Sequence, residues 1–207
     1  MTSAADVTYT NGFGDDDSYE PATLVNGYYE IDNGGKLFWF ASQVNAGTGA
    51  NYKAKLTADI NLDGDNHLWT PMGSSAKQFK GAFDGQGHKI TGLKVETDAE
   101  YTAFIGVHNS STAGNDLKDF SIYGKVTYTG NTDNHCVAGV VAWAYESHKT
   151  QDVWCFVDVE TPNANGTNVR IGGVVGKAQN ATTINRCVYS GTLNGYSTAM
   201  QAAGIVG

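Results

Sequence analysis

An acidic segment at residues 59–65 matches the first half of a calcium-binding loop. Side-chain oxygens recur at alternate positions, and Gly64 stands at the sixth place, where such loops turn sharply. The twelfth place holds Thr70, whereas calcium loops carry a bidentate Glu there. Because a strand that leads into an Asp-Gly turn explains the same residues, no cofactor is expected, and calcium is kept only as an alternative. Its candidate ligands are Asp59, Asn61, Asp63 and Asp65.

Asp84 and His88 stand four residues apart on a Gly-rich segment, a spacing that suits a carboxylate and an imidazole for acid–base catalysis. Asp side chains also bond to the backbone of their own turn, and we expect this role for Asp84. The five histidines lack HxxxH and HExxH spacings, and the three cysteines lack CxxC spacing. The sequence therefore predicts no metal site, and it predicts buried free thiols at Cys136, Cys155 and Cys187.

Three carboxylates come from successive repeats of the chain, at Asp119, Asp152 and Asp158. Paired carboxylates hydrolyse glycosidic bonds, so their convergence would indicate an enzyme. The alignment of the repeats places Asp119 and Asp152 at different positions and Asp158 opposite Ile122 and Tyr189. We therefore assign no catalytic residues, and a polysaccharide-degrading enzyme or its ancillary domain is kept as an alternative function.

Aromatic side chains are the other candidates for function, and they make up 11% of the residues. Ring faces beside Asn, Asp and Thr suit sugar binding, because a ring stacks on a pyranose while polar groups bond its hydroxyls. Trp39 and Trp69 are expected in the core or under the cap. The candidate ligand-binding residues are Trp143, Tyr145 and Trp154.

A tetrad of small, apolar, apolar and small residues recurs along the chain and indicates the elements that position these side chains. Successive tetrads start 36, 34 and 31 residues apart. A period of this size indicates a solenoid, in which each unit buries its apolar face against the next. Three short strands per coil are expected, with glycines at corners that need unusual φ values. The tetrads are Ala103-Phe104-Ile105-Gly106, Gly139-Val140-Val141-Ala142, Gly173-Val174-Val175-Gly176 and Gly204-Ile205-Val206-Gly207.

A second strand follows each of the first three tetrads, and its inward residues are expected to stack in columns. The apolar residues of the three strands set the alignment. The expected columns are Leu117–Val153–Ile184 and Phe120–Phe156–Cys187.

The domain organisation is expected to be a flexible acidic leader followed by a single β-helix domain. A short helix should cap the domain, with Asp32 or Asn33 at its start and Gly47 at its end. Since the chain stops inside a tetrad, we expect truncation at the C-terminus, with self-association through the open C-terminal coil as an alternative. The expected boundaries are 1–26 for the leader, 27–207 for the domain, about 36–46 for the helix and about 52–207 for the coils.

The net charge of −8, from 13 Lys and Arg against 21 Asp and Glu, argues against a nucleic-acid partner, because phosphate binding needs a positive face. No stretch approaches the roughly 18 apolar residues of a membrane span, and the N-terminus lacks the pattern of a signal peptide. We therefore expect no membrane span.

Four motifs occur in order ahead of the tetrads: Leu37-Phe38-Trp39-Phe40-Ala41, residues 56–62 (LTADINL), Trp69-Thr70-Pro71-Met72-Gly73 and residues 79–90 (FKGAFDGQGHKI). Together they resemble the opening of bacterial surface proteins with GLUG-type repeats, over about residues 28–207. Met72 stands where these proteins usually have Ile, and Ala142 where the tetrad would end in Gly. The resemblance implies an all-β fold, a right-handed parallel β-helix, and export or display at the bacterial cell surface. It implies no catalytic residues.

The function expected from these features is adhesion or binding by an extracellular or surface-displayed solenoid. Stacked coils offer long polar faces, and the loops between strands vary in length, which suits recognition of a glycan or a host surface protein. A purely structural stalk is a further alternative. Clustered exposed aromatic rings on one face would favour binding, converging carboxylates would favour catalysis, and a stalk would show neither.

Overall fold

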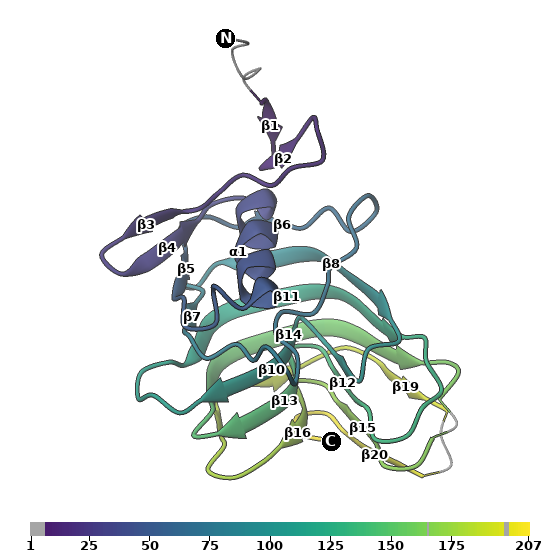
Figure 1. Cartoon of the computed structure of the whole chain (residues 1–207). Coiled ribbons are helices and arrows are strands. Elements are labelled where there is room, and N and C mark those ends of the chain that lie inside the picture. The colour runs from purple at the N-terminus through teal and green to yellow at the C-terminus, as the bar shows by residue number, and fades with distance from the viewer. Residues whose placement is uncertain (1–6, 165, 197–198) are drawn as a thin grey trace.

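The protein is mostly β, and in the computed structural model it forms a β-solenoid of about 4 turns with one short helix near the N-terminus (Figure 1). The structure describes residues 7–164, 166–196 and 199–207. The helix lies at the N-terminal end of the stack, and the last strands, shown in yellow, lie at the opposite end (Figure 1). The all-β solenoid with an N-terminal helix predicted from the tetrads is confirmed.

Each full turn passes through three sheets, whose neighbouring coils pair in parallel. The largest sheet, called here the long sheet, has 11 strands and carries the longest elements of the fold. Its strands are β3 (Thr23–Val25), β4 (Tyr28–Ile31), β5 (Ala54–Leu56), β6 (Ile60–Asn61), β7 (Phe83–Asp84), β8 (Lys89–Thr97), β11 (Leu117–Tyr128), β14 (Lys149–Thr161), β17 (Thr183–Asn185), β18 (Val188–Tyr189) and β19 (Leu193–Gly195).

Two smaller parallel sheets complete each turn and meet at the tetrads. The four-stranded sheet comes first along the chain, and the three-stranded sheet follows it. The four-stranded sheet contains β9 (Tyr101–Thr102), β12 (Cys136–Ala138), β15 (Val169–Gly172) and β20 (Met200–Ala203), and the three-stranded sheet contains β10 (Ile105–Ser110), β13 (Val141–Glu146) and β16 (Val175–Ala178).

The helix α1 (Gly34–Ala46) covers the end of the first coil. Asn33 begins it, because its side-chain oxygen accepts a hydrogen bond from the backbone N–H of Lys36 at 2.9 Å. Gly47 ends it with a φ of 93°, a left-handed conformation in which glycine is favoured. Both caps agree with the sequence prediction, and the helix starts two residues earlier than the expected position 36.

Part of the segment expected as a leader, residues 1–26, lies outside the described residues, and the rest contains β1 (Tyr9–Thr10), β2 (Phe13–Gly14) and β3. The Phe13 ring packs on the His67 ring at 3.8 Å and on the Phe38 ring of α1 at 5.3 Å. The aromatic contacts therefore attach this segment to the helix.

The coils stack at a step of 33 to 34 residues in the long sheet. Leu117 pairs with Thr150, and Thr150 pairs with Ile184. Phe120 pairs with Val153, so the expected columns that placed Val153 beside Leu117 and Phe156 beside Phe120 were wrong. The error has a physical cause, because the inward residue of this coil is the fully buried Thr150, and an alignment by apolar residues passes over it.

In four successive coils, one residue adopts a left-handed conformation at the same level of the long sheet. These residues separate the two halves of the sheet, since β7 and β8 pair with β11 on either side of Asp119, and β17 and β18 pair with β14 on either side of Asp152. Such φ values are costly for residues other than glycine, and least so for Asp and Asn. The residues are Gln86 (φ 52°), Asp119 (φ 58°), Asp152 (φ 54°) and Arg186 (φ 51°).

The tetrad glycines are explained by close packing, and the expectation that they supply unusual φ values was wrong. Gly139 and Gly173 are absent from the described residues with positive φ. A Cβ on Gly139 would lie 2.6 Å from the carbonyl oxygen of Gly173 in the next coil. The corner between the two smaller sheets therefore admits only very small residues.

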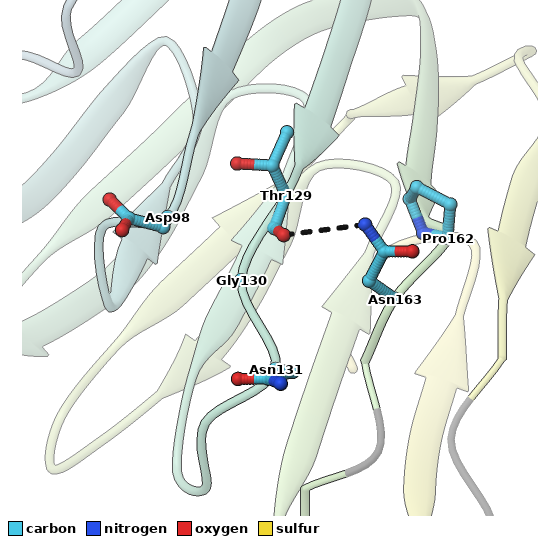
Figure 2. Close-up of a pocket in the computed structure, with 6 residues that line it drawn as sticks. All are labelled: Asp98, Thr129, Gly130, Asn131, Pro162 and Asn163. Atoms are coloured by element: carbon cyan, nitrogen blue, oxygen red, sulfur yellow. Dashed lines mark hydrogen bonds between the residues drawn. The ribbon is translucent and has the colours of Figure 1, made fainter.

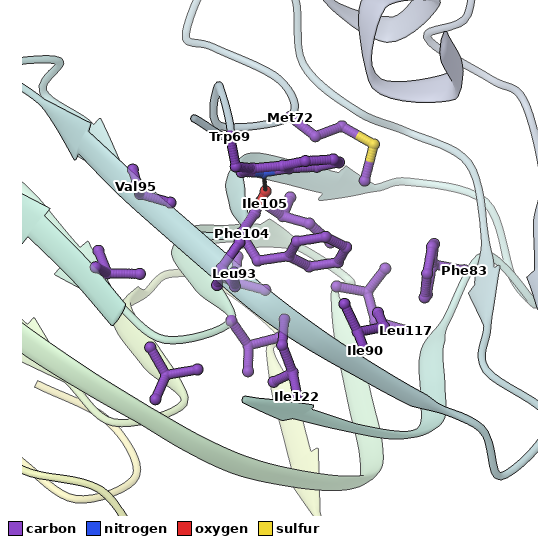
Figure 3. Close-up of a cluster of buried hydrophobic side chains, with 14 of the residues drawn as sticks. Trp69, Met72, Phe83, Ile90, Leu93, Val95, Phe104, Ile105, Leu117 and Ile122 are labelled. Carbon is purple, nitrogen blue, oxygen red and sulfur yellow. Dashed lines mark hydrogen bonds between the residues drawn. The ribbon is translucent and has the colours of Figure 1, made fainter. Parts of the chain in front are cut away.

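The main core runs through the middle of the stack and is filled by inward side chains from every coil (Figure 3). The Trp69 ring stacks on Phe104 at 5.0 Å, and its Nε1 donates a hydrogen bond to the Phe104 carbonyl at 2.7 Å. Burying each such ring contributes roughly 1.5–3 kcal/mol relative to exposing it. The expectation of a core position for Trp69 is confirmed.

A buried polar chain crosses this core from the three-stranded sheet to the long sheet. His108 and His148 are fully buried, and their Nδ1 atoms are 2.6 Å apart. The Nε2–H of His108 donates to the Gly81 carbonyl at 2.9 Å, because a carbonyl only accepts. Neutral His108 then accepts at Nδ1 from His148, whose Nε2 accepts from the Thr150 hydroxyl at 2.6 Å. All of these ring nitrogens are satisfied when both rings are neutral.

Replacing Gln86 with glycine should stabilise the protein by about 0.5–1 kcal/mol, because the left-handed strain outweighs the greater chain entropy of glycine. The exposed strand residue Lys89, three positions away, provides the control, since Lys89→Gly should destabilise. Urea unfolding measures both. A lower free energy of unfolding for Gln86→Gly would contradict the analysis.

Acid should destabilise the protein between pH 6.5 and about 4 through the buried histidine pair. Burial lowers the pKa of His108 to about 4 and moves the pKa of His148 in the same direction. The unfolded chain takes up protons below pH 6.5 that the folded rings refuse, so stability is retained above that pH and falls below it. His108 alone accounts for about 2 kcal/mol between pH 6.5 and 5.

The measurement is the free energy of unfolding against pH, compared with the double variant His108→Leu, His148→Leu. The variant should lose most of this pH slope, whatever its absolute stability. It keeps His135, whose pKa is also lowered by burial, and which therefore leaves a smaller residual slope in both proteins. Equal slopes in the two proteins would contradict the assignment.

Candidate functional site

A hollow of about 460 Å³ lies on the outer face of the long sheet beside Trp154. The indole of Trp154 is 56% exposed, although it belongs to the central strand β14. Among the described residues no aromatic ring packs against it, so more than half of the residue stays accessible to a ligand. Side chains from three successive coils line the hollow: Gly87, Lys89, Asp119, Phe120, Ser121, Tyr123, Asp152 and Trp154.

A pair of stacked rings continues this aromatic surface on the same outer face. Tyr123 and Phe156 are strand partners on neighbouring coils, and their ring centroids lie 4.6 Å apart with an interplanar angle of 5°. Phe156 follows Trp154 by two residues, so both point to the same side of β14. The expected column placed Phe156 in the core, and Tyr123 was not among the candidate residues. The observed strand register places both side chains on the outer face.

The two carboxylates at the hollow belong to residues of the long sheet that adopt the left-handed conformation. Asp119 and Asp152 occupy opposing positions on β11 and β14, and the expectation that they do not align was wrong. Arg186 bonds Asp152 through two guanidinium nitrogens, and this ion pair lowers the pKa of the Asp152 carboxyl. Asp119 lies 3.8 Å from the ammonium group of Lys118.

Asp158 lies away from this carboxylate pair. It pairs with Lys125, not with Ile122 as the repeat alignment indicated, and its carboxylate accepts from the Thr192 N–H at 2.9 Å. The Thr192 hydroxyl donates to the same carboxylate at 2.6 Å, and this bond, with that from the N–H, lowers the pKa of Asp158 and joins two coils. The contact with Thr192 therefore explains Asp158 as a residue that links two coils, without a catalytic role.

The structure separates the three aromatic residues predicted to bind a ligand. Trp143 and Tyr145 lie together on β13 in the three-stranded sheet, with ring centroids 5.2 Å apart, whereas Trp154 lies in the long sheet. Trp143 also stacks on Tyr101 at 5.2 Å, and the Lys177 ammonium group lies 4.5 Å from its ring centroid. Much of the Trp143 ring is therefore already in contact with protein.

Three of the four residues proposed as calcium ligands have side-chain oxygens that already bond to groups of the protein. Asp59 accepts from the Lys89 N–H at 3.0 Å, and Asn61 accepts from the Asp63 N–H at 2.9 Å. Both Asp63 oxygens accept from the Asn66 amide at 3.0 and 3.1 Å, and Asp65 is exposed. Over residues 7–164, 166–196 and 199–207, no group of three or more His, Cys, Asp or Glu is arranged to hold a metal ion.

Asp84 and His88 are directed to different partners. Asp84 accepts from the Gln86 N–H at 3.1 Å and pairs with Lys118 at 3.0 Å. Burial alone would raise the pKa of Asp84, but these hydrogen bonds outweigh it and lower the pKa. His88 contacts Asp59 at 3.1 Å. The predicted turn role of Asp84 is confirmed.

A second hollow, of about 630 Å³, lies among the loops that leave the long sheet (Figure 2). Its lining is polar, and the Asn163 amide reaches the Thr129 carbonyl at 3.5 Å across neighbouring coils. It holds no aromatic ring, which makes it a poorer platform for a sugar than the hollow at Trp154. Its lining residues are Asp98, Thr129, Gly130, Asn131, Pro162 and Asn163.

Comparison with known proteins gives one partial similarity. A 64-residue stretch is 36% identical to a protein named "Putative Gly-rich membrane protein" from Evansella cellulosilytica, and it covers 28% of this chain and 7% of that protein. The chain thus spans a small part of this relative. No protein-family model and no solved structure matches the chain. In the part of the chain that the structure describes, no helix is long and apolar enough to span a membrane.

The two tryptophans should differ in their effect on stability. Trp154→Ala should change the free energy of unfolding by less than about 0.5 kcal/mol, because the ring is exposed. Trp143→Ala should lower it by about 2 kcal/mol, because the stack with Tyr101 and the contact with Lys177 are lost. Urea unfolding checks both values, and a larger loss for Trp154→Ala would contradict this assignment.

Proposed function

We propose that the protein is a glycan-binding module of a surface-displayed or secreted bacterial protein, and that it binds through the hollow at Trp154. The exposed Trp154 beside a hollow lined by aromatic rings and charged side chains carries this proposal. A pyranose stacks on an open indole through its C–H face, while Ser121, Lys89 and Asp119 supply donors and acceptors for its hydroxyls.

The placement on the solenoid favours an extended saccharide. The hollow draws residues from three successive coils, and neighbouring strands lie about 4.8 Å apart. Its lining therefore extends about 10 Å along the stacking direction. An oligosaccharide that lies along the stack contacts more of these residues than a single sugar does.

The proposed location at the cell surface has separate support. The resemblance to GLUG-type surface proteins covers most of the chain, and the partial relative is named as a membrane protein. A host surface protein is the alternative partner, because exposed aromatic side chains such as Trp154 also suit a protein interface.

Catalysis is a second candidate, because the strand register brings Asp119 and Asp152 to the same hollow. Retaining glycosidases use two carboxyl groups about 5–5.5 Å apart, one of them kept protonated. Arg186 engages both carboxylate oxygens of Asp152 and favours its charged form, so Asp152 is held in an ion pair within the protein and does not serve as the protonated acid. Binding is therefore the better-supported function. Release of reducing ends from a polysaccharide by the wild type, and its loss in Asp119→Asn, would favour the enzyme instead.

The test of binding is a glycan array followed by calorimetry on the glycans that bind. Trp154→Ala should weaken binding by at least about tenfold, because the stacking platform is removed. Tyr196→Ala is the matched control, since Tyr196 is an exposed aromatic residue outside the hollow, and it should bind as the wild type does once folding is verified by circular dichroism. Wild-type affinity in Trp154→Ala, or absence of binding to every glycan, would overturn the proposal.

A further inference from the structure

Two cations lie at the corner between the four-stranded and three-stranded sheets, away from the hollow at Trp154. Arg170 belongs to β15 and Lys177 to β16, and both are half-buried. Among the described residues neither has a carboxylate oxygen within 4.0 Å. Removing a cation from water without a counter-charge is unfavourable. This local arrangement is notable in a chain of net charge −8.

Strand register and ring contacts place both cations beside the same aromatic rings. Tyr101 pairs with Cys136, and Cys136 pairs with Arg170, so these residues form one row across the four-stranded sheet. Trp143 pairs with Lys177 across the three-stranded sheet, and the Trp143 and Tyr101 rings stack. We call Tyr101, Trp143, Arg170 and Lys177 the corner patch.

The corner patch has more donors than acceptors. The Trp143 Nε1–H is buried and has no hydrogen-bond partner. Arg170 uses Nη1 to reach the Asn168 carbonyl at 3.4 Å, which leaves other guanidinium donors for a ligand. Glu100 is the acidic neighbour of the patch. Burial and the Glu100 carboxylate together raise the pKa of the Tyr101 phenol. Two positive charges and one negative charge leave the patch net positive.

Cys136 gives independent evidence that the two cations are close together. Burial raises the pKa of the Cys136 thiol, and the positive charges of Arg170 and Lys177 both oppose this rise. Both charges therefore act on the same buried sulfur atom, in agreement with the positions that strand register gives their residues. An anion placed between them would interact with both.

We propose that the corner patch binds the oxyanion of an acidic saccharide, either a uronate carboxylate or a sulfate ester. The planar guanidinium of Arg170 matches two oxygens of such a group, and Lys177 adds a second charge. The Tyr101 ring beside them suits the apolar face of the sugar that carries the anion. The site is separate from the proposed site at Trp154, and neither depends on the other.

The experiment titrates the folded chain with three probes: tri-galacturonic acid, a chondroitin sulfate tetrasaccharide and neutral cellotriose. Calorimetry gives the affinity, and the indole N–H signal of Trp143 in ¹⁵N–¹H NMR spectra locates the site. An acidic probe should bind, shift this signal and bind more weakly in high salt. Binding of only one acidic probe identifies carboxylate or sulfate as the preferred group.

Arg170→Gln and Lys177→Gln should each lower the affinity for the acidic probe about tenfold or more, because each removes one charged partner. Lys53→Gln is the matched control, since Lys53 also lies near an aromatic ring, 5.9 Å from the Tyr28 centroid, and should leave the affinity unchanged. Trp154→Ala should also leave it unchanged. Absence of binding by both acidic probes, or wild-type affinity in both Gln variants, would overturn the proposal.

Discussion

Parallel pairing between successive coils is the interaction on which the rest of the structure depends. β11 and β14 pair in register from Leu117 with Thr150 to Thr127 with Glu160, and this fixes which residue lies above which. Inward positions therefore stack in columns such as Ile60, Ile90, Ile122, Cys155 and Tyr189. A slip by one residue would turn each of these side chains outward. Register thus determines both the core and the composition of each outer face.

Polar groups inside the stack strengthen this specification of register. The chain from Gly81 through His108 and His148 to Thr150 is satisfied only when the three-stranded sheet and the long sheet meet at one relative position. Leaving any of these buried groups without a partner costs about 1–3 kcal/mol. These buried hydrogen bonds therefore destabilise alternative registers that apolar residues alone would tolerate.

The sequence predicted the features that depend on local chemistry. Asn33 and Gly47 mark the helix ends through their own side chain and backbone, and the tetrads indicate the corners. Features set by partners in other coils were harder to predict. The buried Thr150 shifted the alignment by three residues, which placed Phe156 inside and separated Asp119 from Asp152. Trp143 and Trp154 are both tryptophans on strands, and only the three-dimensional contacts show that one is packed and the other open.

Stability does not account for the composition of the outer faces. An indole that is 56% exposed contributes little to folding, and half-buried cations without carboxylate partners oppose it. The ion pair of Arg186 with Asp152 is exposed, and surface ion pairs contribute little to stability, while Arg186 itself adopts a left-handed conformation that is costly for residues other than glycine. Because the core columns already specify the fold, these outward residues are free to meet other requirements. The ligand contacts proposed above give a role to the open ring beside charged groups on one face and to the unpaired donors beside stacked rings on another.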